Sequence, residues 1–260
     1  MRALVLTSNS LRHKYFLKMV DDNFNLVGVV SENKGKYYSE QEKNSALIQK
    51  HFERLRETER LFFSKDLCDF DISSLNVKYI AKDEINQKQV IDWAISLNPS
   101  VVFLFGTGIL KDEWLNRFEN TIINLHLGLS PFYKGSATLF WPFANDELEC
   151  IGATIHLAVQ KVDAGDILIR VKPDINKFDN YYTINYKLIK EAINILPKIS
   201  KSYLAGEIKI EKQVGVKNKF YRKKDFNENV LKQVIDNYGE NIPVKTIVRI
   251  KRSDRCVYCL

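Results

Sequence analysis

The sequence predicts an α/β fold, in which a mostly parallel sheet is flanked by helices and followed by a small C-terminal subdomain. In the first two thirds of the chain, short β-branched apolar runs alternate with longer amphipathic stretches. That alternation is typical of parallel strands joined by crossover helices. After Gly206 the alternation ends and basic residues become frequent. A chain of 260 residues is long enough for one such domain and a small appendage.

The predicted strands are short apolar runs rich in β-branched residues, and the predicted helices repeat apolar residues every three or four positions. The strands are residues 3–7, 26–31, 77–81, 101–106, 122–126, 153–159 and 167–171. The helices are residues 11–21, 40–60, 86–96 and 181–204. Together they form a Rossmann-like main domain, which we place at residues 1–204.

The remaining residues, 205–260, form the predicted subdomain. Apolar and polar residues alternate over 207–213, and residues 220–222 can return as a partner strand, so we expect a β-hairpin. A short helix over 227–238 and a last apolar-basic strand near Ile247 complete it.

Composition indicates an ordinary globular protein, because 45% of the residues are hydrophobic and 27% are charged. No apolar run approaches the roughly 18 residues that a membrane span needs. We therefore expect a cytoplasmic enzyme with no membrane partner.

The four cysteines do not predict a metal site. Cys256 and Cys259 have the spacing of half a zinc site, but a structural zinc ion needs four ligands and the neighbouring sequence supplies no others. We expect reduced thiols and no metal.

The net charge of +7 is concentrated in the tail, since residues 205–260 hold 13 Lys or Arg and 7 Asp or Glu. Such a tail can bind a nucleic acid or a phosphorylated small molecule, or it can simply be solvated. The composition alone leaves these alternatives open, but we do not expect a nucleic acid as partner.

Chemistry-bearing residues gather near the end of the strand predicted at 122–126. Asn124 and His126 are two residues apart, so they project from the same side of that strand. The carboxyl ends of strands are where open α/β sheets bind ligands. Asn124 can donate hydrogen bonds to a developing oxyanion, and His126 can exchange a proton near neutral pH. Asp163, if the chain folds back, would orient the imidazole.

These residues form part of a longer pattern that resembles the formyltransferases that use 10-formyltetrahydrofolate. The pattern consists of Asn124-Leu-His126, Leu129-Ser-Pro131, Tyr133-Lys-Gly135, residues 152–156 and residues 163–168. The Asn-x-His…Asp triad of that family falls on Asn124, His126 and Asp163. Transfer of a formyl group to an amine needs an oxyanion donor and a proton acceptor together, which this triad would supply.

The resemblance implies a folate pocket and a cosubstrate, 10-formyltetrahydrofolate. One wall would be formed by Phe105, Gly106, Thr107, Gly108 and Ile109. Val162 and Gly165 would form the other wall. The chain departs from the family pattern at Leu127, where Pro is usual, and at Lys134, where Arg is usual.

The acceptor is suggested by the rest of the chain. The tail after residue 204 is too short for the C-terminal barrel of methionyl-tRNA formyltransferases, and residues 7–10 lack the Gly-rich phosphate loop of the purine enzyme. The chain is most similar to nucleotide-sugar N-formyltransferases, in which such a tail often pairs two subunits. This implies a nucleotide-linked amino sugar as substrate, a role in bacterial lipopolysaccharide (O-antigen) biosynthesis, and a homodimer. A methionyl-tRNA enzyme, an enzyme for another small amine and a non-catalytic folate or nucleotide-binding protein remain alternatives.

A phosphate of the carrier could bind where the first strand meets the first helix. The side chains there are Ser8, Asn9, Arg12, His13 and Lys14. A helix N-terminus attracts phosphate. The same residues equally fit a helix cap followed by a solvated basic turn.

Overall fold

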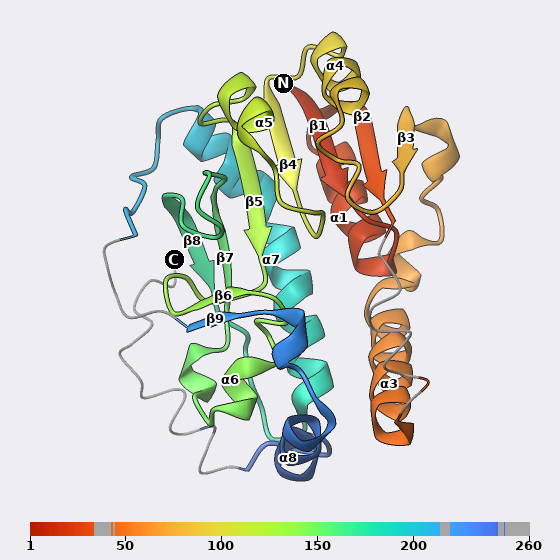
Figure 1. Cartoon of the computed structure of the whole chain (residues 1–260), viewed down its shortest axis with the longest axis vertical. Helices are drawn as coiled ribbons and strands as arrows, with labels where there is room; N and C mark the ends of the chain where they lie inside the picture. The colour runs from red at the N-terminus through yellow and green to blue at the C-terminus, as the bar shows by residue number, and fades with distance from the viewer. Residues whose placement is uncertain (34–42, 44, 214–218, 244–246, 248–260) are drawn as a thin grey trace.

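A seven-stranded sheet forms the centre of the protein in the computed structural model, which describes residues 1–33, 43, 45–213, 219–243 and 247. The strand order is β3-β2-β1-β4-β5-β7-β8 (Figure 1). The strands are β1 (Arg2–Thr7), β2 (Asn25–Glu32), β3 (Val77–Ile80), β4 (Val101–Leu104), β5 (Ile122–His126), β7 (Ala153–Leu157) and β8 (Ile167–Val171). The mostly parallel sheet predicted from the sequence is confirmed.

The first five strands are parallel, whereas β7 pairs antiparallel with both β5 and β8. The parallel strands all end at one edge, where β1 and β4 lead into the segments that begin at Ser8 and Phe105. Because β7 runs back along β5, His156 lies directly opposite Asn124. The polar residues at the end of β5 therefore face a second strand as well as the neighbouring loops.

Helices cover both faces of the sheet. The helices are α1 (Leu11–Asp21), α3 (Ala46–Phe63), α4 (Lys88–Ser96), α5 (Asp112–Arg117), α6 (Trp141–Ala144), α7 (Tyr181–Leu204) and α8 (Glu228–Tyr238), of which α6 and α8 pack against each other. Val5 and Phe103 face the core shared with α1, α3 and α7, while Leu4 and Val102 face the core shared with α4 and α5. This alternation arises because successive side chains of a strand point to opposite faces.

Local sequence explains where the long helices begin. Ser45 caps α3, because its side chain accepts a hydrogen bond from the N–H of Ile48. Asn180 forms a capping box with Thr183 at the start of α7. The predicted helix 40–60 corresponds to α3, although residues 40–42 and 44 lie outside the described part of the chain. No described helix combines the length and hydropathy needed to cross a bilayer.

The C-terminal segment pairs differently from the predicted hairpin. Strand β9 (Lys219–Tyr221) pairs in parallel with β6 (Tyr133–Gly135). Over residues 207–213 the only described bridge joins Glu211 to Ile167. Through this long-range pairing, β9 supplies hydrogen-bond partners for the backbone of β6, in the segment that follows β5. The alternation of apolar and polar residues within 207–222 could not indicate such a distant partner. The predicted helix 227–238 is confirmed as α8, and the strand expected near Ile247 falls almost wholly outside the described residues.

Candidate active site

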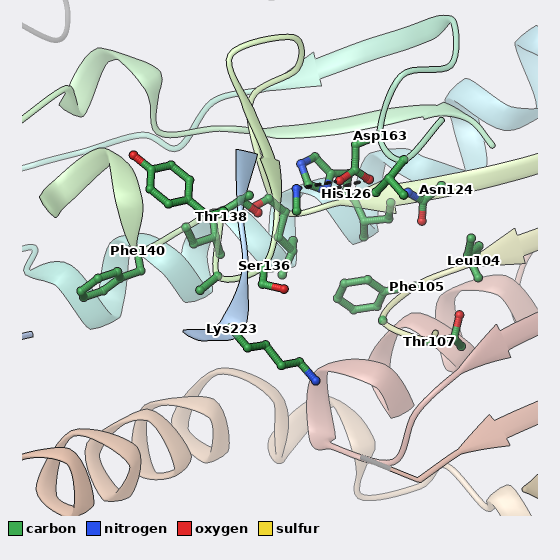
Figure 2. A pocket seen from close by; sticks show the side chains of 18 of the residues that line it. Leu104, Phe105, Thr107, Asn124, His126, Ser136, Thr138, Phe140, Asp163 and Lys223 are labelled. Atoms are coloured by element: carbon green, nitrogen blue, oxygen red, sulfur yellow. Dashed lines mark hydrogen bonds and ion pairs between the residues drawn. The ribbon is translucent and has the colours of Figure 1, made fainter. Parts of the chain in front are cut away.

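The side chains of Asn124, His126 and Asp163 lie together at the carboxyl end of β5. Figure 2 shows all three on one wall of a cleft, with the Asp163 carboxylate beside the His126 ring. The strand supplies two of them, and the loop between β7 and β8 brings in the third. The structure therefore assembles the triad that the sequence suggested.

The His126 ring is held between two acceptors. Its Nε2 lies 3.0 Å from the carbonyl oxygen of Tyr133, and its Nδ1 lies 3.2 Å from Oδ1 of Asp163. A carbonyl oxygen can only accept, so the proton of the neutral ring belongs on Nε2. The Nδ1 atom then faces the carboxylate, and a second proton placed there would lie between the two groups.

Burial lowers the pKa of His126 below its usual 6.5, although the nearby Asp163 charge acts in the opposite direction. Burial alone would raise the pKa of Asp163, but the positive charge that His126 carries when it is protonated, together with the hydrogen bond from the N–H of Gly135, lowers that pKa to about 2. At neutral pH the pair therefore combines an ionised carboxylate with an imidazole that has room for a proton.

The loop that carries Asp163 is fixed by its backbone. Asp163 has a positive φ of 52°, a conformation that costs free energy and that short polar side chains tolerate best. Its Oδ2 accepts a hydrogen bond from the N–H of Gly135 at 3.0 Å. Gly165 brings the loop so close to β7 that a Cβ there would lie 1.8 Å from the Leu157 oxygen. The carboxylate is thus held in one orientation.

His156 is a further polar group at this centre. Its Nδ1 lies 2.8 Å from the Leu157 oxygen, so that nitrogen carries the proton and Nε2 is left to accept. Nε2 lies 2.9 Å from Nδ2 of Asn124 and 3.8 Å from the Asp163 carboxylate. One hydrogen of the Asn124 amide is therefore used internally, and the other can be donated to a ligand. The pairing of His156 with Asn124 depends on the antiparallel β7, which the sequence did not show.

The cleft beside these residues has a volume of about 790 Å³. The wall after β4 is formed by Phe105, Gly106, Thr107, Gly108 and Ile109, all of which line it. Val162 lines the opposite wall, whereas Gly165 packs against Leu157 behind it. Six of the seven residues expected at a folate pocket thus border one continuous cavity.

A buried carboxylate shapes the wall after β4. Glu32, at the end of β2, is 5% exposed and accepts hydrogen bonds from the backbone N–H groups of Gly108 and Asp83. It therefore joins the loops that follow β3 and β4. Glu32 is not part of a recognisable sequence motif, so its contact with the loops after β3 and β4 becomes apparent only from the structure.

The residues expected to bind a phosphate are divided by the structure. Arg12 and His13 line the cleft. Ser8 and Asn9 lie outside its lining, and Lys14 lines a separate, smaller cavity. The guanidinium of Arg12 is 2.9 Å from the Glu59 carboxylate, which ties α1 to α3.

The far part of the cleft contains residues that the sequence did not single out as site residues. Lys223, Arg222 and Phe226 reach it from the C-terminal segment, and His51 reaches it from α3. In Figure 2, Lys223 lies between Phe140 on one side and Asn124 on the other. The general basic character of the tail was the only sequence signal for this contribution.

No cluster of three or more His, Cys, Asp or Glu side chains in the described part of the chain has a geometry that could hold a metal ion. Cys256 and Cys259 lie outside the described residues.

Comparison with known proteins gives a family match over most of the chain. The model of the formyl transferase family matches residues 1–199. Those residues contain the whole sheet, the triad and both walls of the cleft next to it.

Solved structures with the same fold include formyltransferases that are named for different substrates. The phosphoribosylglycinamide formyltransferase of Anaplasma phagocytophilum is 17% identical, with a TM-score of 0.58 over 86% of this chain and 98% of its own. A sugar N-formyltransferase from Shewanella is 16% identical, with a TM-score of 0.58 over 93% of this chain and 91% of its own. The formyltransferase PseJ of Anoxybacillus kamchatkensis is 19% identical, with a TM-score of 0.53 over 94% of this chain and 97% of its own. PseJ was solved with UDP-4,6-dideoxy-4-formamido-L-AltNAc and tetrahydrofolate.

Proposed function

The chain belongs to the formyl transferase family, and on this basis we propose that it transfers the formyl group of 10-formyltetrahydrofolate to the primary amine of a nucleotide-linked amino sugar. The family supplies the reaction. The proposed acceptor rests on the shape and charge of the cleft beyond the triad.

The observation that carries the proposal is the charge of the cleft lining. Among the described residues, its Lys, Arg, Asp and Glu side chains are Arg12, Arg222, Lys223 and Asp163. The one carboxylate, Asp163, is paired with His126, and Arg12 is paired with Glu59, so the positive charge of the rest of the lining comes from Arg222 and Lys223. A diphosphate carrier brings the complementary negative charge. An amine attached to such a carrier can reach the triad while the phosphates remain near Arg222 and Lys223.

The triad supplies the chemistry through its own hydrogen bonds. The free hydrogen of the Asn124 amide donates to the formyl oxygen, where negative charge develops as the amine attacks. The His126–Asp163 pair takes up the proton that the attacking amine loses, and it returns a proton to N10 of tetrahydrofolate as the bond between N10 and the formyl carbon breaks. The Tyr133 carbonyl keeps the ring in place during this exchange.

The folate side of the cleft fits a flat, partly polar ring system. The backbone over 105–109 offers peptide groups, and Val162 and Val159 offer apolar surface across from it. PseJ, which has the same fold, was solved with tetrahydrofolate. We propose that the formyl donor enters along this wall and that the acceptor enters from the side of Lys223.

Glycinamide ribonucleotide is the second candidate acceptor, because it also joins a primary amine to a phosphate and because the enzyme from Anaplasma phagocytophilum has the same fold. A monophosphate would use less of the basic far part of the cleft than a nucleoside diphosphate would.

A panel of acceptors tests the proposal. Tetrahydrofolate release and product mass are measured with UDP- and dTDP-linked 4-amino-4,6-dideoxy sugars, glycinamide ribonucleotide and methionyl-tRNA. We expect turnover on one nucleotide amino sugar, and none with the His126→Ala variant. Turnover confined to glycinamide ribonucleotide or methionyl-tRNA would overturn the proposed acceptor, and silence across the panel would overturn the function.

A further inference from the structure

Besides Thr138 and His156, three polar side chains outside the triad are buried along the cleft. His13, His51 and Asn185 are 2%, 4% and 3% exposed, and all of them line the cavity. His51 has a partner, because its Nδ1 lies 3.2 Å from the hydroxyl of Tyr182. The side-chain oxygen of Asn185 has no hydrogen-bond partner among the described residues.

An unpaired buried amide is costly, because folding removes its water without replacing the lost hydrogen bond. Its neighbours on α7 show that the helix can hold apolar residues here. Ile184 and Leu188 are fully buried, and Ile189, one turn after Asn185, is apolar and lines the same cleft. A Leu at position 185 would suit the packing at least as well as Asn does. An unpaired amide oxygen beside a cleft is a group that a hydrogen-bond donor of a ligand would satisfy.

We propose that Asn185 binds a neutral hydrogen-bond donor of the acceptor molecule, either a hydroxyl or an amide N–H. This inference rests on the proposed function and identifies a residue that selects the acceptor. Since Oδ1 can only accept, its partner must carry a hydrogen. Discrimination against acceptors that lack this group follows, because the amide oxygen would then remain unpaired.

The position of Asn185 assigns it to the acceptor and not to the folate. It lies on α7, whereas the folate walls come from the loops after β4 and β7. Tyr181 lies one turn earlier on α7, and the centroid of its ring is 5.7 Å from that of His51 and 6.2 Å from that of Phe140. Both of those rings line the cleft, and Phe140 lies across Lys223 from Asn124 in Figure 2. Asn185 thus belongs to the part of the cleft that the carrier and its sugar would occupy.

The Asn185→Leu variant tests this assignment. We use UDP-linked 4-amino-4,6-dideoxy-L-AltNAc and dTDP-linked 4-amino-4,6-dideoxyglucose as probes and measure kcat, both KM values and the melting temperature. KM for the acceptor should rise about 10- to 100-fold. KM for 10-formyltetrahydrofolate should stay within about twofold, and the melting temperature should be equal or higher. Asn185→Ala, which removes the amide without adding a branched side chain, repeats the test if the Leu variant does not fold.

Ser200→Ala is the matched control. Ser200 also lies on α7 and is fully buried, and its hydroxyl oxygen has no hydrogen-bond partner in the described part of the chain, but it does not line the cleft. Its loss should leave both KM values unchanged.

An unchanged acceptor KM in the folded Asn185 variants would overturn the inference, as would a rise in KM for 10-formyltetrahydrofolate as large as the rise for the acceptor. If wild-type protein formylates neither probe, the proposed function fails. Calorimetric binding of the two nucleotide sugars to wild type and to Asn185→Leu then decides the inference, and equal affinities would contradict it.

Discussion

Replacing Gly135 with Ala should damage both the fold and the triad. Gly135 has a φ of 91°, and a Cβ at this position would lie 2.2 Å from the backbone oxygen of Tyr221 on β9. Its N–H also donates to the Asp163 carboxylate at 3.0 Å. The substitution therefore strains the backbone, separates β6 from β9 and shifts the donor that orients Asp163.

The expected magnitude follows from these contacts. A left-handed conformation costs a residue with a Cβ about 1 to 3 kcal/mol, and overpacking against backbone costs about 1 to 3 kcal/mol more. The free energy of unfolding should therefore fall by about 3 kcal/mol. A well-aligned hydrogen bond to a carboxylate contributes about 1.5 to 3 kcal/mol. Misaligning the bond between Gly135 and Asp163 should therefore lower kcat about 10- to 100-fold.

Gly206 provides the control, because it also has a positive φ, 72°, but a Cβ added there would meet no atom of the described residues within 4 Å. Gly206→Ala should lose about 1 kcal/mol and retain full kcat. Urea unfolding gives the stability of each variant, and tetrahydrofolate release gives its rate. If Gly135→Ala were as stable and as active as Gly206→Ala, the proposed coupling between β9 and the triad would be refuted.

Three other predictions concern charge. Burial lowers the pKa of His51 to about 4, so the free energy of unfolding of the wild type should fall by about 3 kcal/mol as the pH falls from 6.5 to 4. His51→Gln should remove that part of the pH dependence in urea unfolding. An unchanged pH dependence would show that His51 is not the group that titrates. Lys223→Met should raise KM for the nucleotide sugar about 10-fold and leave KM for the folate unchanged. Lys224→Met changes a neighbouring lysine outside the cleft lining and should alter neither KM. If both variants changed KM for the nucleotide sugar equally, the phosphates would have to bind elsewhere. Because burial lowers the pKa of His126 and the neutral ring must accept the proton, kcat/KM should be lost as the pH falls through a value below 6.5; a loss of activity centred above pH 7 would exclude this role.

Local patterns predicted most of the fold. The runs at 122–126 and 167–171 and the helices at 11–21 and 181–204 coincide with β5, β8, α1 and α7. These elements are long or strongly apolar, so their periodicity is clear. The parallel pairing of β9 with β6 was missed because it joins segments far apart in the chain, and short alternating runs do not identify their partners.

The site was predicted to a similar depth. The family pattern indicated Asn124, His126 and Asp163, and the structure brings them together. The family pattern could not indicate Glu32 or the role proposed for Asn185, because both depend on neighbours from other helices and strands. Ser8 and Asn9 were expected to bind phosphate because of their place before α1, but of the residues expected there only Arg12 and His13 line the cleft.

A double-mutant cycle on His126 and Asp163 tests the central claim most directly. His126→Asn, Asp163→Asn and the double variant are compared in kcat for formyl transfer to the acceptor that the panel identifies. If the two residues act as one proton-accepting unit, each single change should lower kcat about 100- to 10,000-fold, and the double change should cost little more. Independent, multiplicative losses, or near-wild-type activity in either single variant, would contradict the account.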